Sequence, residues 1–120
     1  MSLLENSPSH RIALFSLNEP GDGLKFAARL LDLGWKIVAT QNVALCFAES
    51  GIQAEDVSHF LSVKESYPFP PTLHPEMELA LTTTSTTAID LVFDITYPLS
   101  KGNDVGGHTL LALAAKGNRI

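Results

Sequence analysis

The chain has 120 residues, of which 45% are hydrophobic and 18% are charged, and its formal net charge is −5. This length predicts one domain with a buried core, residues 11–120, after a flexible arm at residues 1–10. The negative charge argues against a nucleic-acid partner, which needs a basic surface. A single cysteine and the lack of a long apolar run predict a cytoplasmic protein without a disulfide framework or a membrane span.

Short apolar runs alternate with segments of helical periodicity along the chain. Strands are predicted at residues 11–16, 35–40, 53–58 and 89–96. Helices are predicted from residue 24 to the stop at Gly34, at 43–49, at 76–81 and at 106–116, with Gly117 in the C′ position of the last. The alternation predicts an α/β fold, a three-layer sandwich with a short parallel sheet.

Ligands bind parallel sheets at the carboxyl ends of the strands. Four segments are predicted to meet there: residues 16–23, 40–43, 67–77 and 96–107. The third reads YPFPPTLHPEM, and its prolines fix the backbone and remove donors, which excludes a regular helix or a central strand. This stiff loop holds Thr72 and His74. His74 either faces a ligand or braces the turn, and both interpretations stay open.

Four motifs carry a resemblance to a known family: Ala13-Leu14-Phe15-Ser16, Thr72-Leu73-His74-Pro75, Thr96-Tyr97-Pro98-Leu99, and the run from Asp104 through Gly106-Gly107-His108 to Lys116. Together they resemble the methylglyoxal-synthase-like fold. More specifically, they are similar to the IMP cyclohydrolase domain of the bifunctional purine-biosynthesis enzyme that also carries an AICAR formyltransferase. The resemblance covers about residues 11–119.

The resemblance implies an IMP cyclohydrolase, a cyclic amidine hydrolase of purine biosynthesis. Such an enzyme closes the purine ring of a formylated aminoimidazole carboxamide ribonucleotide by dehydration, without a metal or another cofactor. The implied partners are a small phosphorylated, nucleotide-like ligand, a formyltransferase, and a second copy of the chain in a homodimer.

Ring closure needs donors at a developing oxyanion and groups that move protons. The resemblance assigns catalytic positions to Tyr97, Asp104, Lys116 and His74. It assigns substrate binding to Ser16, Thr40, Asn42, Thr72, Gly106 and Gly107.

Simpler structural roles remain open for several of these residues. Asp104 is also a candidate helix cap, Lys116 a complement to a helix dipole, and Tyr97 a packing residue at a strand end. A straight helix from Asp104 to Lys116 would rise about 18 Å, so the two cannot reach one small group from it. The four histidines and one cysteine show no metal-ligand spacing.

The sequence departs from the family pattern at its cations. Phe69 and Pro71 stand where the family has arginine and lysine, and Pro20 stands where a first-loop lysine is expected. Residues 40–43 lack the family's glycine pair. These departures predict a degenerate site with reduced or lost activity, which favours an alternative: a non-catalytic module that binds a phosphorylated metabolite.

The family pattern also continues into a further strand after the helix that ends at Lys116. Without that strand, the strand at residues 89–96 or its neighbour is predicted to lie at an edge of the sheet. A partner chain would cover it, so a third hypothesis is a structural protein that completes a sheet or dimer with another chain.

Overall fold

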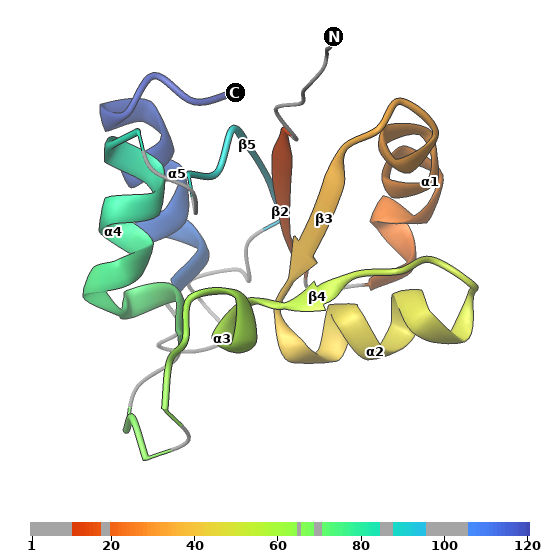
Figure 1. The fold of residues 1–120 in the computed structure, drawn as a ribbon, viewed down its shortest axis with the longest axis horizontal. Helices are drawn as coiled ribbons and strands as arrows, with labels where there is room; N and C mark the ends of the chain where they lie inside the picture. The colour runs from red at the N-terminus through yellow and green to blue at the C-terminus, as the bar shows by residue number, and fades with distance from the viewer. Residues whose placement is uncertain (1–10, 18–19, 65, 69–70, 85–87, 96–105) are drawn as a thin grey trace, which may run out of the picture.

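A four-stranded parallel sheet lies between two layers of helices (Figure 1). The computed structural model describes residues 11–17, 20–64, 66–68, 71–84, 88–95 and 106–120. The strands are β2 (Ile12–Leu17), β3 (Lys36–Ala39), β4 (Glu55–Asp56) and β5 (Leu91–Ile95), in the order β4-β3-β2-β5. The predicted α/β class and three-layer arrangement are confirmed.

β2 is the central strand because it is apolar on both faces. Its residues alternate between two buried clusters, with Leu14 in one and Phe15 in the other. Both of its edges are paired, so that Ala13 lies opposite Ile37 of β3 and Leu91 of β5. A strand enclosed in this way is typical of a parallel sheet covered on both faces.

The first face of the sheet is covered by α1 (Leu24–Asp32) and α2 (Gln41–Glu49). Phe15 lies at the centre of this layer, with its ring centroid 5.5 Å from that of Phe47 and 5.4 Å from that of Phe93. The pair with Phe47 holds α2 against the sheet, close to the point where β3 ends, and the pair with Phe93 joins β2 to its neighbour β5.

The second face is covered by α3 (Val57–Phe60), α4 (Pro75–Thr82) and α5 (Gly106–Lys116). Figure 1 shows α4 and α5 side by side across the sheet from α1 and α2. Two 3₁₀ segments, η1 (Pro20–Gly23) and η2 (Pro71–Leu73), lie between the longer elements. η2 belongs to the segment at residues 67–77, which we call the proline loop. Because α5 packs against η2, this part of the proline loop lies beside the last helix.

Two predicted boundaries are corrected. α2 begins at Gln41 and not at residue 43, because Thr40 is extended and its carbonyl accepts a bond of 2.8 Å from the Ala44 N–H. The predicted strand at residues 53–58 shortens to Glu55–Asp56. Asp56 ends it, because its carboxylate accepts from the Ser58 N–H at 2.8 Å and starts α3 instead.

Four helices end with a residue in the left-handed conformation, and these residues are Gly34, Gly51, Ser62 and Asn118. At the end of α5, the Asn118 N–H bonds Ala115 and the Arg119 N–H bonds Ala114, which is a Schellman motif. The C′ residue is therefore Asn118, and the prediction of Gly117 was wrong by one position. Gly117 has a different constraint, since a Cβ there would lie 1.7 Å from the Leu81 carbonyl oxygen.

Arg119 joins the ends of three segments through its guanidinium group. It donates to the carbonyls of Ile89 at 2.7 Å, Thr83 at 2.6 Å and Gly117 at 3.0 Å. Carbonyls at a helix end attract a cation, so this side chain fixes the end of α4 beside the approach to β5.

The β5 side of the sheet carries a short extension. The Ile120 N–H bonds the Asp90 carbonyl at 3.1 Å, and the Val92 N–H bonds the Ile120 carbonyl at 2.9 Å. This is the hydrogen-bond pattern of one parallel bridge. Within the described residues, β5 is the end strand of the sheet, and the bridge from Ile120 pairs only part of its length. No helix among these residues has the length and apolar character needed to cross a membrane.

Replacing Gly117 with alanine should lower the free energy of unfolding by about 3 kcal/mol, because the new methyl group would collide with the backbone of Leu81. The matched control is Gly21→Ala, where a Cβ would meet nothing within 4 Å. It should change stability by less than about 0.5 kcal/mol. Urea unfolding curves compare the two, and equal stabilities would contradict the close contact.

Candidate functional site

A cleft lies where the carboxyl ends of β3 and β4 lead into α2 and α3. Its volume is about 560 Å³, which is in the range of small-molecule sites. Its lining combines hydroxyl, amide and charged side chains with a few apolar ones: Thr40, Gln41, Asp56, Val57, Ser58, His59, Val63, Lys64, Tyr67 and Pro71. We call this the carboxyl-edge cleft.

The first turn of α2 contributes backbone donors to this edge. Thr40 is the N-cap residue, with φ −63° and ψ 157°, but its side chain makes no capping hydrogen bond. Its own N–H is bonded to the Phe15 carbonyl at 3.2 Å, which ties the start of α2 to the end of β2. The first amides of any helix have no partner within the helix. In α2 the Thr40 side chain does not cap them.

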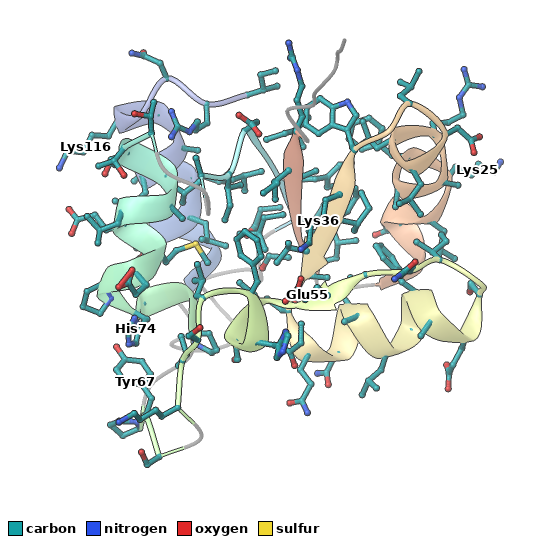
Figure 2. The ribbon with its side chains drawn as sticks, viewed as in Figure 1. Lys25, Lys36, Glu55, Tyr67, His74 and Lys116 are labelled. Atoms are coloured by element: carbon teal, nitrogen blue, oxygen red, sulfur yellow. The ribbon has the colours of Figure 1, made fainter. Side chains whose placement is uncertain are left out.

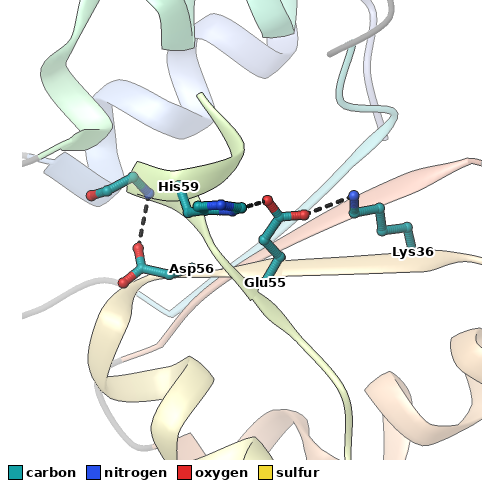
Figure 3. Close-up of polar contacts among 5 residues, drawn as sticks. Lys36, Glu55, Asp56 and His59 are labelled. Carbon is teal, nitrogen blue, oxygen red and sulfur yellow. Dashed lines mark hydrogen bonds and ion pairs between the residues drawn. The ribbon is translucent and has the colours of Figure 1, made fainter. Parts of the chain in front are cut away.

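Glu55 connects the sheet to the cleft (Figure 3). One carboxylate oxygen lies 2.7 Å from the Lys36 ammonium on β3, and the other is hydrogen-bonded to Nδ1 of His59 on α3. The Lys36 ammonium also lies 5.2 Å from the centre of the Phe60 ring. Glu55 is thus held from both sides and fixes the ring of His59.

The pKa of Glu55 is shifted by these neighbours. Partial burial alone would raise it, but hydrogen bonds from Lys36 and His59, together with their charges, hold the pKa of the carboxyl below its ordinary value. The ionised form is therefore favoured in the folded protein. The next residue, Asp56, is the N-cap of α3, and its carboxylate accepts the Ser58 N–H, as Figure 3 shows.

His74 braces the proline loop. Its Nδ1 accepts the Glu76 N–H at 3.0 Å, so it caps α4, and a neutral ring carries its proton on Nε2. Its ring lies edge-on to Tyr67, with centroids 4.6 Å apart, and the Tyr67 hydroxyl donates to the Leu73 carbonyl at 3.3 Å. The bracing role is shown, and Nε2 is the nitrogen left for any ligand.

Lys116 lies away from the carboxyl-edge cleft. It ends α5, and its Nζ is 3.6 Å from a carboxylate oxygen of Glu78 on α4, with both side chains more than half exposed. Figure 2 shows it at the opposite end of this helical layer from His74. α5 is one continuous helix from Gly106 to Lys116, so within the described residues no break in the helix brings Lys116 back toward its start.

The other predicted substrate residues lie around the same edge. Ser16 is opposite Asp94 near the end of β2, and Asn42 is exposed on the first turn of α2. Thr72 lies in η2, and the pair Gly106 and Gly107 begins α5, which packs against η2. Tyr97 and Asp104 lie outside the described residues. The structure thus brings Thr40 and Pro71 to one cleft, whose described lining does not include Ser16, Asn42 or His74.

The lining includes residues that sequence reasoning did not assign to a site: Gln41, Asp56, Ser58, His59, Lys64 and Tyr67. A signal for part of this set exists in the sequence. Asp56 followed by Ser58 is a helix-start pattern, which places the next residue, His59, on a new helix. The hydrogen bond between His59 and Glu55 joins α3 to the strand before it, so helical spacing does not predict this contact.

A second hollow, of about 690 Å³, lies beside the start of β3 and around β4, next to Trp35 and Ala54. Its charged residues include Lys36 and Glu55, which are already paired with each other. It therefore offers a ligand fewer unpaired charged groups than the carboxyl-edge cleft does.

Among the residues described, no group of three or more histidine, cysteine or acidic side chains is placed to hold a metal ion.

Comparisons with known proteins support the fold. No protein-family model matches the sequence, and no curated protein matches it. Among solved structures, the crystal structure of a protein called ForH is similar, with a TM-score of 0.73 and 25% identity. The match covers 90% of this chain and 69% of the ForH chain. The name ForH states no activity, so the likeness supports the architecture and leaves the function to the site.

Replacing Glu55 with glutamine removes its ion pairs with Lys36 and His59 and should lower the free energy of unfolding by about 0.5 kcal/mol at pH 7. The loss is small because both partners are solvent-exposed. The lowered pKa means that this stabilisation is present above the pKa of the unfolded chain and is lost as pH falls through that of the folded protein. Urea unfolding from pH 7 to pH 3 should show the difference disappear. Glu49→Gln, at an exposed position, is the control. An equal loss of stability there would contradict the attribution of this stabilisation to the ion pairs of Glu55.

Replacing His74 with alanine should lower the free energy of unfolding by about 1 kcal/mol, because α4 loses its cap. His74→Asn restores a capping oxygen and should recover most of this stability. Thermal and urea unfolding measure both variants. Equal destabilisation by the two substitutions would contradict the capping role and point to packing on Tyr67 instead.

Proposed function

We propose that this chain is an IMP-cyclohydrolase-like protein that binds a phosphorylated, nucleotide-like ligand in the carboxyl-edge cleft. One observation carries this proposal. Thr40 and Pro71 line the same cleft although they are far apart in the sequence, and both belong to segments that the resemblance assigns to substrate binding. The cleft lies where ligands bind in parallel sheets and has the volume of a small-molecule site.

The reaction in this proposal is closure of the purine ring of a formylated aminoimidazole carboxamide ribonucleotide. The amide nitrogen attacks the formyl carbon and one of its protons passes to the oxygen. The resulting hydroxyl takes up a second proton and leaves as water, while the nitrogen of the formamide gives up its own proton and the ring C=N bond forms. The developing oxyanion needs donors, and the departing oxygen needs a proton. Hydroxyls of Thr40 and Ser58 supply donors in the cleft. The resemblance places an acid–base role at Asp104 and a further donor at Tyr97. A formyltransferase partner, a homodimer and a cytoplasmic location accompany this function.

A second candidate function is a non-catalytic module for a phosphorylated metabolite, similar to the effector domain at the end of carbamoyl phosphate synthetase. Specific observations favour it. Nδ1 of His74 is occupied as a helix cap, and the Lys116 ammonium is paired with Glu78 away from the cleft. Pro71 lines the cleft where the resemblance expects a lysine. In each case a group that the resemblance would use in catalysis is engaged elsewhere or replaced, while the binding cleft itself is present.

A thermal-shift panel combined with a turnover assay tests both candidates. Ribonucleoside monophosphates, including aminoimidazole carboxamide ribonucleotide and its formylated form, should raise the melting temperature in a saturable manner, because a ligand of the folded state stabilises it. The matching unphosphorylated nucleosides are the control. Release of a closed purine ring supports the cyclohydrolase, and binding without turnover supports the module. No stabilisation by any phosphorylated compound would contradict both.

A further inference from the structure

Two basic side chains line the carboxyl-edge cleft in addition to the residues that the resemblance assigns there. His59 belongs to α3, and Lys64 follows this helix by four residues. We propose that they form an anion-binding pair and hold the phosphate of a phosphate monoester. This inference rests on the proposed function, and it names the residues that recognise the ligand.

The ring of His59 is oriented before any ligand arrives. Its Nδ1 is bonded to one carboxylate oxygen of Glu55, whose other oxygen is held by Lys36 at 2.7 Å. The His59 side chain is 83% exposed, so Nε2 is accessible to a ligand at the mouth of the cleft. Because Nδ1–H is donated to Glu55, Nε2 donates to a phosphate oxygen when the ring is protonated and carries its second N–H. A fixed ring loses little rotational freedom on binding, which favours recognition.

The acidic side chains Glu55 and Asp56, which precede α3, both have partners, and Asp56 contributes a carboxylate to the cleft lining. The negative charge of Glu55 is shared between Lys36 and His59, and one oxygen of Asp56 accepts the Ser58 N–H. Lys64 is exposed and forms no ion pair within the part of the chain that the structure describes. No carboxylate of the described residues therefore has to be displaced before its ammonium binds a ligand.

The surrounding donors indicate a phosphate rather than a simple carboxylate. Hydroxyls of Thr40 and Ser58 line the same cleft as the two basic groups. A phosphate monoester presents three terminal oxygens to such donors, and bonds between charged partners are the stronger ones. The remaining lining, with Gln41, Tyr67 and Val63, offers polar and apolar surface to the rest of the ligand.

The test compares His59→Gln and Lys64→Gln with a matched control, Lys25→Gln. Lys25 is an exposed lysine of α1, on the far side of the molecule from Tyr67 in Figure 2. Affinities for aminoimidazole carboxamide ribonucleotide and for inorganic phosphate are measured by calorimetry. Imidazole ¹⁵N signals of the unsubstituted protein are followed during the phosphate titration and assigned with the His59→Gln variant.

Each cleft substitution should weaken nucleotide binding at least tenfold, since each removes a charge-assisted bond, and Lys25→Gln should leave it within twofold. The His59 ring signals should move saturably with phosphate. If the nucleotide stabilises the protein while both variants bind normally and the His59 signals stay fixed, the anion-binding pair is overturned and the proposed function stands. If no phosphorylated compound binds or stabilises the protein at all, the proposed function falls with it.

Discussion

The burial of β2 on both faces is the constraint on which the rest of the structure depends. Leu14 packs under α4 and α5, Phe15 packs against α2, and both edges of the strand are paired. A strand with two apolar faces needs helices on each side, and parallel neighbours need crossover connections. The carboxyl ends of β3 and β4 therefore emerge on one edge, where the chain turns into α2 and α3. The carboxyl-edge cleft is a consequence of this arrangement.

Much of the fold follows from periodicity in the sequence. The apolar runs that became β2, β3 and β5 and the helix over residues 106–116 were predictable because their own residues determine them. The errors came from local polar contacts: Thr40 starts α2 early, Asp56 ends β4, and Asn118 replaces Gly117 at the end of α5. For the site, the parallel-sheet rule located Thr40 and the proline loop. It did not find His59, whose partner Glu55 lies four residues earlier on a strand and not on the same helix. It did not find Arg119 either, because tertiary packing brings its partners to it.

The polar groups of this edge divide into those that support the fold and those left for a ligand. His74 caps α4, Asp56 caps α3, and Glu55 fixes the ring of His59. Lys64 and the hydroxyls of Thr40 and Ser58 line the cleft. Binding needs only such donors, whereas catalysis also needs a proton-transfer group aligned with the reacting atoms. Tyr97 and Asp104, to which the resemblance assigns catalytic positions, lie outside the described residues, so the described part of the site bears on recognition.

The central claim is that a phosphorylated, nucleotide-like ligand occupies the carboxyl-edge cleft. The most direct measurement is a crystal structure of the protein soaked with aminoimidazole carboxamide ribonucleotide. The account predicts a phosphate within hydrogen-bonding distance of Lys64 and His59, with the rest of the nucleotide between α2 and the proline loop. A nucleotide bound in the hollow beside Trp35, or a carboxyl-edge cleft left empty at saturating ligand, would contradict it.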